Sequence, residues 1–326
     1  MRRSTFRRLP IGKVPIDVLN TTVLRFTGAH SDRITTPAKA GVDFAAVRAG
    51  NGYIVVSADP VTGVSKEIGT YALRVSANDV ATCGHRPQFA ESVILLPEGS
   101  TSRQVEEIAR QVHESAKRLE IAIVGGHTEV TPGLSHPIVV IAAFCYVGDY
   151  VTSGDAMPGD SIIMTKTAGM EGTAILGGSK RFLDKLSVVD EAVTAYGTGC
   201  VHAMHDCTEG GVLGAVFEMS LASRLGFELV ERRVPVAPET ANLCRMYAID
   251  PLKLIGSGAL LLSVEKGREQ QVMNALSPVR ATTVGTFKKS GRTLVRKDGS
   301  MVTLLDAPED ELWRAVARAS GRRHWL

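Results

Sequence analysis

Residues 101–126 read TSRQVEEIARQVHESAKRLEIAIVGG, and this stretch decides the fold class. Thr101 and Gln104 have the spacing of a capping box, in which two side chains satisfy free backbone N–H groups at the start of a helix. Apolar residues then recur at helical spacing. The short apolar run at 121–124 is typical of a buried strand and leads into a Gly-Gly pair. A helix followed directly by a strand indicates an α/β protein.

The same alternation continues on both sides of this stretch. Strand-like runs occur at 53–57, 93–96, 138–147, 162–165, 227–230 and 260–262, and helix-like patterns follow residues 67 and 211 and cover 266–276. A polar stretch, TSGDAMPGD at 152–160, interrupts the pattern with two glycines and a proline. Because 326 residues exceed one ordinary core, we predict two domains, residues 1–155 and 156–326.

The composition excludes several classes of protein. The net charge of +3 and the 5% of aromatic residues argue against nucleic-acid binding. No apolar run approaches the roughly 18 residues of a membrane helix. The five cysteines are scattered without a CxxC pair, which argues against a zinc site or a disulfide framework. We therefore expect a cytoplasmic protein.

Acidic residues follow or interrupt apolar elements at three places in the first half. Asp43 lies in GVDFAAV and Asp59 in SADPVTG, where a carboxylate at a strand end could hold Mg²⁺. The alternative for Asp59 is a cap on a turn before Pro60. Asn78 and Asp79 lie in a predicted helix, although both residue types have low helix propensity. They indicate either a functional site or a solvated helix face.

Two glycine-bearing stretches could contact phosphate. In VGGHTEVTPG, residues 124–133, the Gly-Gly pair could offer backbone N–H groups to an anion, or it could simply form a turn. In HDCTEGGVLGA, residues 205–215, the positive end of the following helix could face phosphate oxygens. No GxxxxGK[ST] motif occurs, so a P-loop enzyme is excluded.

Taken in order, these stretches resemble the superfamily of aminoimidazole ribonucleotide (AIR) synthetase, HypE, thiamine-monophosphate kinase and selenophosphate synthetase. The resemblance rests on SADPVTG, SANDVATCGHRP, VGGHTEVTPG, PGDSIIMTKTAGMEGTAIL, HDCTEGGV and IDPLKLIGSGALLLSV. The HypE-like, AIR synthase-related group is the most similar. This resemblance implies a PurM-like fold with an N-terminal domain that forms a barrel in a homodimer and a C-terminal α/β domain.

The resemblance also implies ATP and Mg²⁺ as cofactors and assigns roles to residues. Metal ligands would be Asp43, Asp59 and Asp79, and catalytic residues would be Asp59, Asp79, Asp206 and His127. The nucleotide would contact Lys13, Asn78, Gly125, Gly126, Thr128, Thr208, Glu209 and Gly210. Two departures stand out. His127 occupies a position where relatives carry an acidic residue, and the last cysteine of this chain is Cys244, whereas HypE uses a C-terminal one.

Three functions are compatible with these residues. The first is an ATP-dependent enzyme that activates a carbonyl or amide oxygen of a small molecule or a protein. The second is a nucleotide-binding partner of a maturation complex that does not turn ATP over. The third is the purine-pathway cyclo-ligase, phosphoribosylformylglycinamidine cyclo-ligase, which is disfavoured because GGHTEVTPG lacks the acidic residues expected in that motif.

Overall fold

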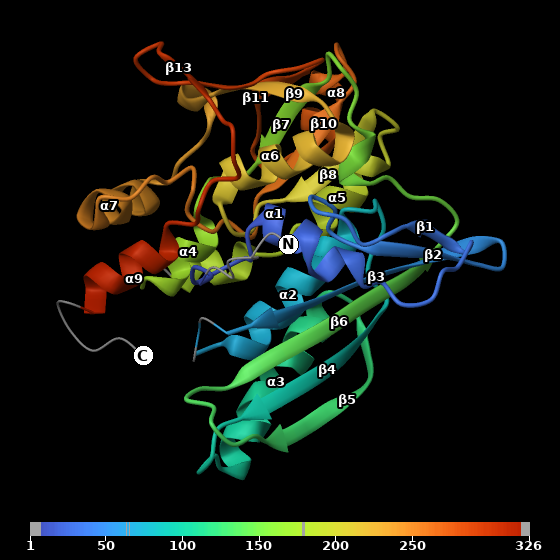
Figure 1. Ribbon diagram of the computed structural model, residues 1–326, viewed down its shortest axis with the longest axis vertical. Coiled ribbons are helices and arrows are strands. Elements are labelled where there is room, and N and C mark those ends of the chain that lie inside the picture. Colours follow the sequence, from blue (N-terminus) through green and yellow to red (C-terminus); the bar gives the residue numbers. More distant parts are fainter. Residues whose placement is uncertain (1–7, 63, 65, 178–179, 321–326) are drawn as a thin grey trace, which may run out of the picture.

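The computed structural model describes residues 8–62, 64, 66–177 and 180–320, and it contains two β-sheets with helices packed against them (Figure 1). The first sheet has six strands in the order β1-β2-β3-β6-β4-β5. Its strands are β1 Ile34–Thr36, β2 Ala45–Ala49, β3 Gly52–Val61, β4 Phe89–Leu96, β5 Ala122–Val130 and β6 Ile138–Val147. Helices α2 (Ile68–Ala81) and α3 (Ser102–Arg118) cover one face.

The second sheet has seven strands in the order β13-β12-β9-β11-β7-β10-β8. Its strands are β7 Ser161–Thr165, β8 Val201–Asp206, β9 Gly226–Val230, β10 Leu260–Val264, β11 Ala281–Lys288, β12 Arg292–Val295 and β13 Met301–Thr303. The helices of this half are α4 Met170–Ile175, α5 Val189–Tyr196, α6 Gly211–Ser223, α7 Pro238–Tyr247, α8 Glu269–Ala275 and α9 Leu312–Ser320. The two-domain α/β prediction is confirmed.

Short helical segments complete the described chain: α1 Ile16–Thr21 and the 3₁₀ turns Val23–Arg25, Ser153–Asp155, Lys180–Lys185 and Glu231–Arg233. The helix predicted after Thr101 is α3, and both hydrogen bonds of its capping box are present. Among the described residues, none of the helices is both long enough and apolar enough to cross a bilayer.

One hydrophobic core continues from the first sheet into the second. It joins residues under α2, such as Ala72 and Ile141, to Ile163 and Leu262 of the second sheet, all fully buried. A further core lies between the second sheet and α6 and is built around Phe227 and Phe287. The shared core fixes how the two halves meet, and the functional residues lie along that junction.

Two details of the predicted strands were wrong. Of the buried strand predicted at 121–124, Ile121 is buried but precedes β5, and residues 122–124 begin β5, which continues to Val130 and is exposed along its whole length. This happens because β5 is the outermost strand and pairs only with β4. The polar turn expected from Asp59 onward is not a turn, since β3 continues through Asp59 and Pro60 to Val61, pairing with β6.

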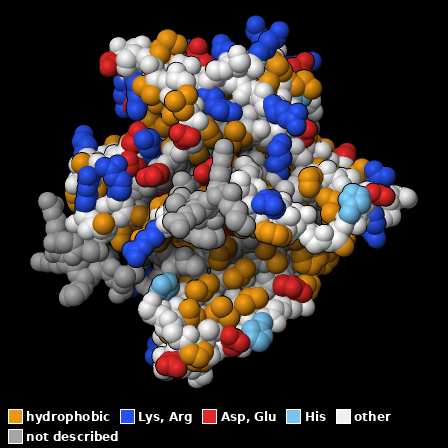
Figure 2. Space-filling view, in the orientation of Figure 1, with side chains coloured by type: hydrophobic (Ala, Val, Ile, Leu, Met, Phe, Trp, Pro, Cys, Tyr) orange, Lys and Arg blue, Asp and Glu red, His pale blue; other side chains and the backbone are white. Residues whose placement is uncertain are grey.

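The face of the first sheet opposite α2 and α3 is apolar and uncovered. Figure 2 shows hydrophobic side chains gathered over this sheet, in the lower half of the view. Ile54 of β3, Tyr146 of β6 and Phe89 of β4 are 41%, 50% and 39% exposed. The single chain therefore forms an open sheet and not a closed barrel.

Candidate metal and phosphate site

Asp59 and Asp79 meet where β3 faces helix α2. Alternate residues of β3 point toward the helix, and Ser57 Oγ donates a hydrogen bond to Asp79 Oδ2 at 2.9 Å. The carboxyl group of Asp59, two residues further along β3, lies beside that of Asp79. Burial, followed by the neighbouring carboxyl group of Asp59, raises the pKa of Asp79 well above its usual value. Two carboxyl groups held this close favour a shared proton or a cation.

Asp43, in the loop before β2, and Asp206, at the end of β8, approach the same place. Asp43 Oδ1 lies 3.1 Å from His205 Nε2, and ligand atoms of Asp43, His205 and Asp206 all lie within 4.8 Å of one another. Burial raises the pKa of Asp43 to about 6 although His205 lowers it. Burial and then Asp43 raise the pKa of Asp206 well above its usual value. We call Asp43, Asp59, Asp79 and Asp206 the acidic cluster.

His205 is a buried residue that the sequence analysis did not select. Its Nδ1 lies 2.7 Å from the Asp206 carbonyl oxygen, and its Nε2 lies 3.1 Å from Glu218 Oε2. Burial lowers the pKa of His205, but Asp43 and Glu218 outweigh this and raise it to about 9. Nδ1 donates to the Asp206 carbonyl oxygen, whereas Nε2 lies between the carboxylates of Asp43 and Glu218 as an ion-pair contact without a hydrogen bond of its own among the described residues.

Lys13 reaches the cluster from the N-terminal segment. Its Nζ lies 3.3 Å from Thr208 Oγ1 and 3.6 Å from Glu218 Oε1, while half of its side chain stays accessible (51%). Burial lowers the pKa of Lys13, but Glu218 and further carboxylates raise it well above its usual range. Conversely, burial alone raises the pKa of Glu218, but Lys13 and His205 lower it to about 2. Lys13 is thus a fixed positive charge beside the cluster.

The oxygen atoms of the cluster fit a divalent cation. Both carboxylate oxygens of Asp206 and Oδ2 of Asp43 are buried without a hydrogen-bond partner among the described residues. Buried carboxylates without partners are costly unless they are paired or bind a metal. Mg²⁺ prefers oxygen ligands of this kind. Asp43, Asp59, Asp79 and Asp206 could hold such an ion, whereas His205 is already engaged by carboxylates.

The start of helix α6 carries a carboxylate of the protein itself. Gly210 N–H donates to Asp310 Oδ2 at 2.7 Å, and Asp310 Oδ1 accepts from Leu312 N–H at 2.7 Å. Burial raises the pKa of Asp310 to about 6 although these two N–H groups lower it. The N–H of Gly210, predicted to contact phosphate, is therefore already hydrogen-bonded, while Thr208 and Glu209 remain beside Lys13.

The Gly125-Gly126 stretch lies away from the acidic cluster within one chain. Asp59 pairs with Ile141, Ile141 with Ser92 and Ser92 with Gly126. These are three strand spacings of about 4.8 Å, so Asp59 and Gly126 are roughly 14 Å apart. The sheet therefore separates the predicted glycines and Thr128 from Asp59.

His127 points to the uncovered face of the sheet. It follows Gly126, which is in register with the helix-facing Ser92, and successive side chains alternate between faces. His127 Nε2 lies 2.9 Å from Glu129 Oε2, and Thr131 Oγ1 donates to Glu129 Oε1 at 2.7 Å. His127 is 61% exposed and is not joined to the cluster in the single chain.

Asn78 connects the two domains. Its Nδ2 donates to the Leu186 carbonyl oxygen and its Oδ1 accepts from Val188 N–H, both at 2.8 Å. The side chain is fully buried. Because its amide group makes hydrogen bonds at both ends, Asn78 is placed to hold α2 against the second domain and not to line a phosphate path.

Glu218, Asp310 and His205 were not predicted from the sequence. A signal existed for Glu218, since it is the single charged residue in the apolar helix GVLGAVFEMSLAS, α6. No local signal existed for Asp310, which reaches Gly210 from 100 residues away in the chain.

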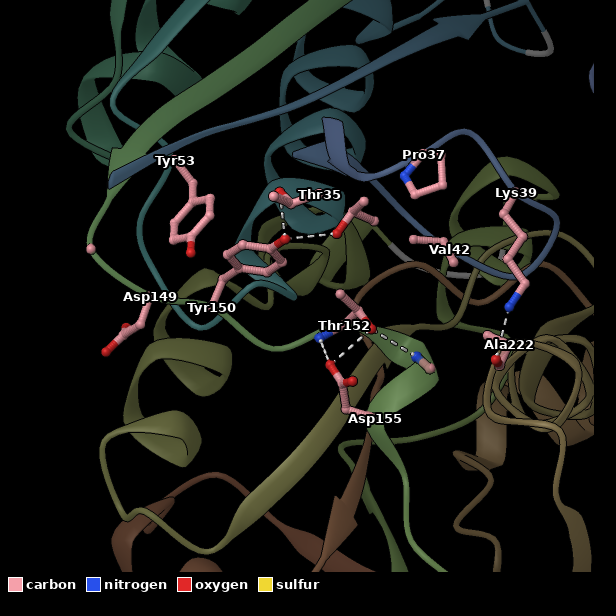
Figure 3. A pocket seen from close by; sticks show the side chains of 13 residues that line it. Thr35, Pro37, Lys39, Val42, Tyr53, Asp149, Tyr150, Thr152, Asp155 and Ala222 are labelled. Atoms are coloured by element: carbon pink, nitrogen blue, oxygen red, sulfur yellow. Dashed lines mark hydrogen bonds between the residues drawn. The ribbon is translucent and has the colours of Figure 1, made fainter. Parts of the chain in front are cut away.

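A separate cavity of about 560 Å³ lies at the junction of the two domains, and none of its lining residues belongs to the acidic cluster (Figure 3). The Tyr150 hydroxyl lies 2.8 Å from Thr35 Oγ1 and 2.9 Å from Thr36 Oγ1. At the opposite side Lys39 Nζ donates to the Ala222 carbonyl oxygen. Val42 lines this cavity, whereas its neighbour Asp43 belongs to the acidic cluster.

Two family models match the chain, one in each half. The AIR synthase related protein N-terminal domain matches residues 41–147, and the AIR synthase related protein C-terminal domain matches residues 157–298. The carbamoyl dehydratase HypE of Escherichia coli is 30% identical over 237 residues, covering 67% of this chain and 68% of that protein. The HypE of Rhizobium leguminosarum bv. viciae is 26% identical over 256 residues, covering 73% of each.

Solved structures show the same fold. A hydrogenase maturation protein HypE in complex with ATP superimposes with a TM-score of 0.72 at 21% identity, covering 94% of this chain and 98% of that one. Both halves of the chain match family models and the fold is that of HypE. The chain belongs to the AIR synthase related protein family.

Proposed function

We propose that this protein is an ATP- and Mg²⁺-dependent enzyme of the HypE-like group that transfers phosphate to a carbonyl or amide oxygen of an acceptor. The observation that carries the proposal is the acidic cluster, in which four aspartates from separate elements approach one another. Within it, Oδ2 of Asp43 and both carboxylate oxygens of Asp206 are buried without a hydrogen-bond partner in the part of the chain that the structure describes. A magnesium ion bound there would neutralise the phosphates as charge develops. Family relatives named carbamoyl dehydratase support this class of reaction.

Different residues of this chain would bind the metal, contact phosphate and position the carboxylates. Asp43, Asp59, Asp79 and Asp206 would hold the metal. Lys13, which already bridges Thr208 and Glu218, would contact phosphate oxygens and stabilise the charge that develops on them. His205 would keep Asp43 and Glu218 in position.

The test is calorimetric titration of ATP with and without Mg²⁺, followed by an assay of ATP turnover. We expect metal-dependent binding that Asp59→Asn removes. Asp298→Asn serves as the control, since Asp298 is exposed and accepts hydrogen bonds from the N–H and hydroxyl groups of Ser300 in its own turn. ATP binding that is the same with and without Mg²⁺ and that is unchanged in Asp59→Asn would contradict the proposal.

A second candidate function is a nucleotide-binding maturation partner without turnover. Asp310 favours it, because this carboxylate already occupies the N–H of Gly210. The test is long incubation of ATP with wild type and with Asp310→Asn. This alternative is supported if both proteins bind ATP and leave it intact.

We also propose a homodimer formed through the uncovered face of the first sheet. Ile54, Phe89 and Tyr146 leave an apolar surface there, and apolar sheet faces normally pack against another layer. A second copy would turn the open sheet into the expected barrel. Analytical ultracentrifugation should give a dimer for wild type and a monomer for Tyr146→Asp; a monomeric wild type would refute this.

A further inference from the structure

The cavity at the junction of the two domains has the size of a small-molecule site. Thr35 and Thr36 of β1 and Tyr53 of β3 line it from the first domain, the segment 148–155 lines it from the connection between the domains, and Ala222 lines it from α6 (Figure 3). Its volume is about 560 Å³, and pockets that hold small molecules measure roughly 300–1,000 Å³. A ligand bound here would contact both domains.

Two tyrosine rings form an aromatic corner of this cavity. The rings of Tyr53 and Tyr150 meet edge to face, with centroids 5.0 Å apart and an angle of 77° between their planes. The hydroxyl of Tyr150 is held by Thr35 and Thr36, whereas that of Tyr53 has no hydrogen-bond partner in the described part of the chain. Tyrosine rings attract cations to their faces, and a free hydroxyl can accept a hydrogen bond.

Two carboxylates of the lining keep one oxygen each for a ligand. Asp149 Oδ1 lies 2.9 Å from the Tyr196 hydroxyl and 3.0 Å from His85 Nε2, and these two groups, Tyr196 first, hold the pKa of Asp149 below its usual value. Asp155 Oδ2 accepts from the N–H and hydroxyl groups of Thr152 at 2.7 and 2.9 Å. The other oxygen of each carboxylate makes no hydrogen bond to a residue that the structure describes, so it can accept one from a ligand.

Lys39 is the one cationic side chain among the described residues of the lining, and it is already engaged. Its Nζ donates to the Ala222 carbonyl oxygen at 2.9 Å, one of the carbonyl groups that the end of α6 leaves free. Lys39 therefore caps the negative end of this helix. Figure 3 shows it at the side of the cavity away from Tyr53 and Asp149. With two carboxylates against one engaged lysine, the lining favours a cation over an anion.

We propose that this cavity binds a small organic cation that carries ammonium or guanidinium groups. Its N–H groups would donate to the free oxygens of Asp149 and Asp155, since charge-assisted bonds of this kind are among the strongest in proteins. Its positive charge would also be attracted to the tyrosine corner. Its apolar part would lie against Pro37 and Val42, which line the same cavity. The inference is independent of the proposed function, because none of these residues belongs to the acidic cluster.

The test is calorimetric titration of the full chain with agmatine, which carries one ammonium and one guanidinium group. Mg²⁺ and ATP are left out, so the result does not depend on nucleotide binding. We expect agmatine to bind, and neutral butylurea and anionic glutarate to bind at least about tenfold more weakly, since both lose the contacts to the carboxylates. No binding of agmatine, or equal binding of glutarate, would overturn the proposal.

Two variants identify the site. Asp155→Asn keeps an oxygen for Thr152 but loses the charge, so agmatine binding should weaken about tenfold. Tyr53→Phe keeps the ring but loses the hydroxyl, and the loss should be about threefold. Unfolding temperatures without agmatine check that both variants are folded. Wild-type affinity in both variants would place agmatine elsewhere and refute the cavity as its site.

Asp32→Asn is the matched control. Asp32 is exposed and pairs with His30 Nε2 at 2.9 Å, as Asp149 pairs with His85, but it does not line the cavity. Agmatine binding should be unchanged in this variant. A loss as large as that in Asp155→Asn would mean general attraction to negative surface charge and not a site. Crystals soaked in agmatine should show it between the tyrosine corner and Asp149, and density only at other places would contradict the assignment.

Discussion

The segment after β8 and the strand β5 both carry a Gly-Gly pair, yet the structure uses the two pairs differently. Gly211 begins helix α6 at φ +61, and a Cβ there would lie 2.7 Å from the carbonyl oxygens of Leu252 and Leu254. Gly126 lies inside a strand, and its Cβ would lie 1.9 Å from the Ser92 carbonyl oxygen. A Gly-Gly pair signals a close approach of backbone, but not whether a ligand or another strand approaches.

The largest expected effect is on nucleotide binding, which should depend on the acidic cluster and not on strand β5. Asp79→Asn should weaken Mg²⁺-ATP binding roughly hundredfold or more, because removing one partner from a buried charged site costs about 3–5 kcal/mol. His127→Ala should change it less than about threefold in monomeric protein, since an exposed histidine–carboxylate pair contributes little. Calorimetry on both variants measures this difference.

If His127→Ala weakened Mg²⁺-ATP binding as much as Asp79→Asn, the two regions would not differ in their role in nucleotide binding. It would mean that β5 belongs to the site in the assembled protein, with the strand supplied by a second copy. Repeating the measurement in Tyr146→Asp, designed as a monomer, tells whether the effect depends on that copy.

The structural use of Gly126 predicts the next largest effect. Gly126→Ala should lower the free energy of unfolding by about 2–4 kcal/mol, because the added methyl group forces β4 and β5 apart. Gly125→Ala is the control, since its Cβ would meet only Glu91 Oε1, at 3.5 Å. Urea unfolding measures both. Similar small losses in the two variants would show that Gly126 is not needed for strand pairing.

Local signals predicted most of the fold and a part of the site. Helix α3 followed from spacing, because helix periods are local properties, whereas the site roles of Asp59 and Asp79 came from the family resemblance. Asn78 and Asp79 show the limit. Successive helix residues point about 100° apart, so Asp79 faces β3 while Asn78 contacts the second domain. Which of the two side chains points into the site depends on how the domains pack.

Long-range contacts explain the remaining failures. Whether β5 is central or outermost depends on strand order, and its apolar start at 121–124 is the same in both cases. Asp310 meets Gly210 only because the C-terminal segment folds back over α6. No pattern near either residue records that contact, so the sequence could predict an anion at Gly210 but not that the protein supplies it.

The buried Glu171 predicts a pH dependence of stability. Burial raises its pKa from the ordinary 4.5 to about 7. Ser257 offsets part of this rise, and the nearby carboxylates of Asp310 and Glu209 add to it. The folded state thus holds the proton more tightly, so this stabilisation is complete below pH 4.5 and is lost as the pH rises through about 7. Glu171→Gln should remove that loss, at most about 3 kcal/mol.

Unfolding by urea at several pH values between 4 and 8 compares wild type with Glu171→Gln. The difference in unfolding free energy should grow in favour of the variant as the pH rises. A constant difference would mean that Glu171 has an ordinary pKa and that its surroundings are more polar than its burial indicates.

The smallest expected effect concerns the helix that precedes β5. Thr101→Ala removes the side chain that accepts from Gln104 N–H and should cost about 1 kcal/mol of unfolding free energy. Ser102→Ala, one residue further on, should change little, because the capping hydrogen bonds at this helix start are made by Thr101 and Gln104. Urea midpoints of the two variants give the difference. The effect is small because the cap acts only within one turn, whereas Gly126 and Asp79 act between elements. The features that sequence reveals most clearly are therefore those whose individual loss the fold tolerates best.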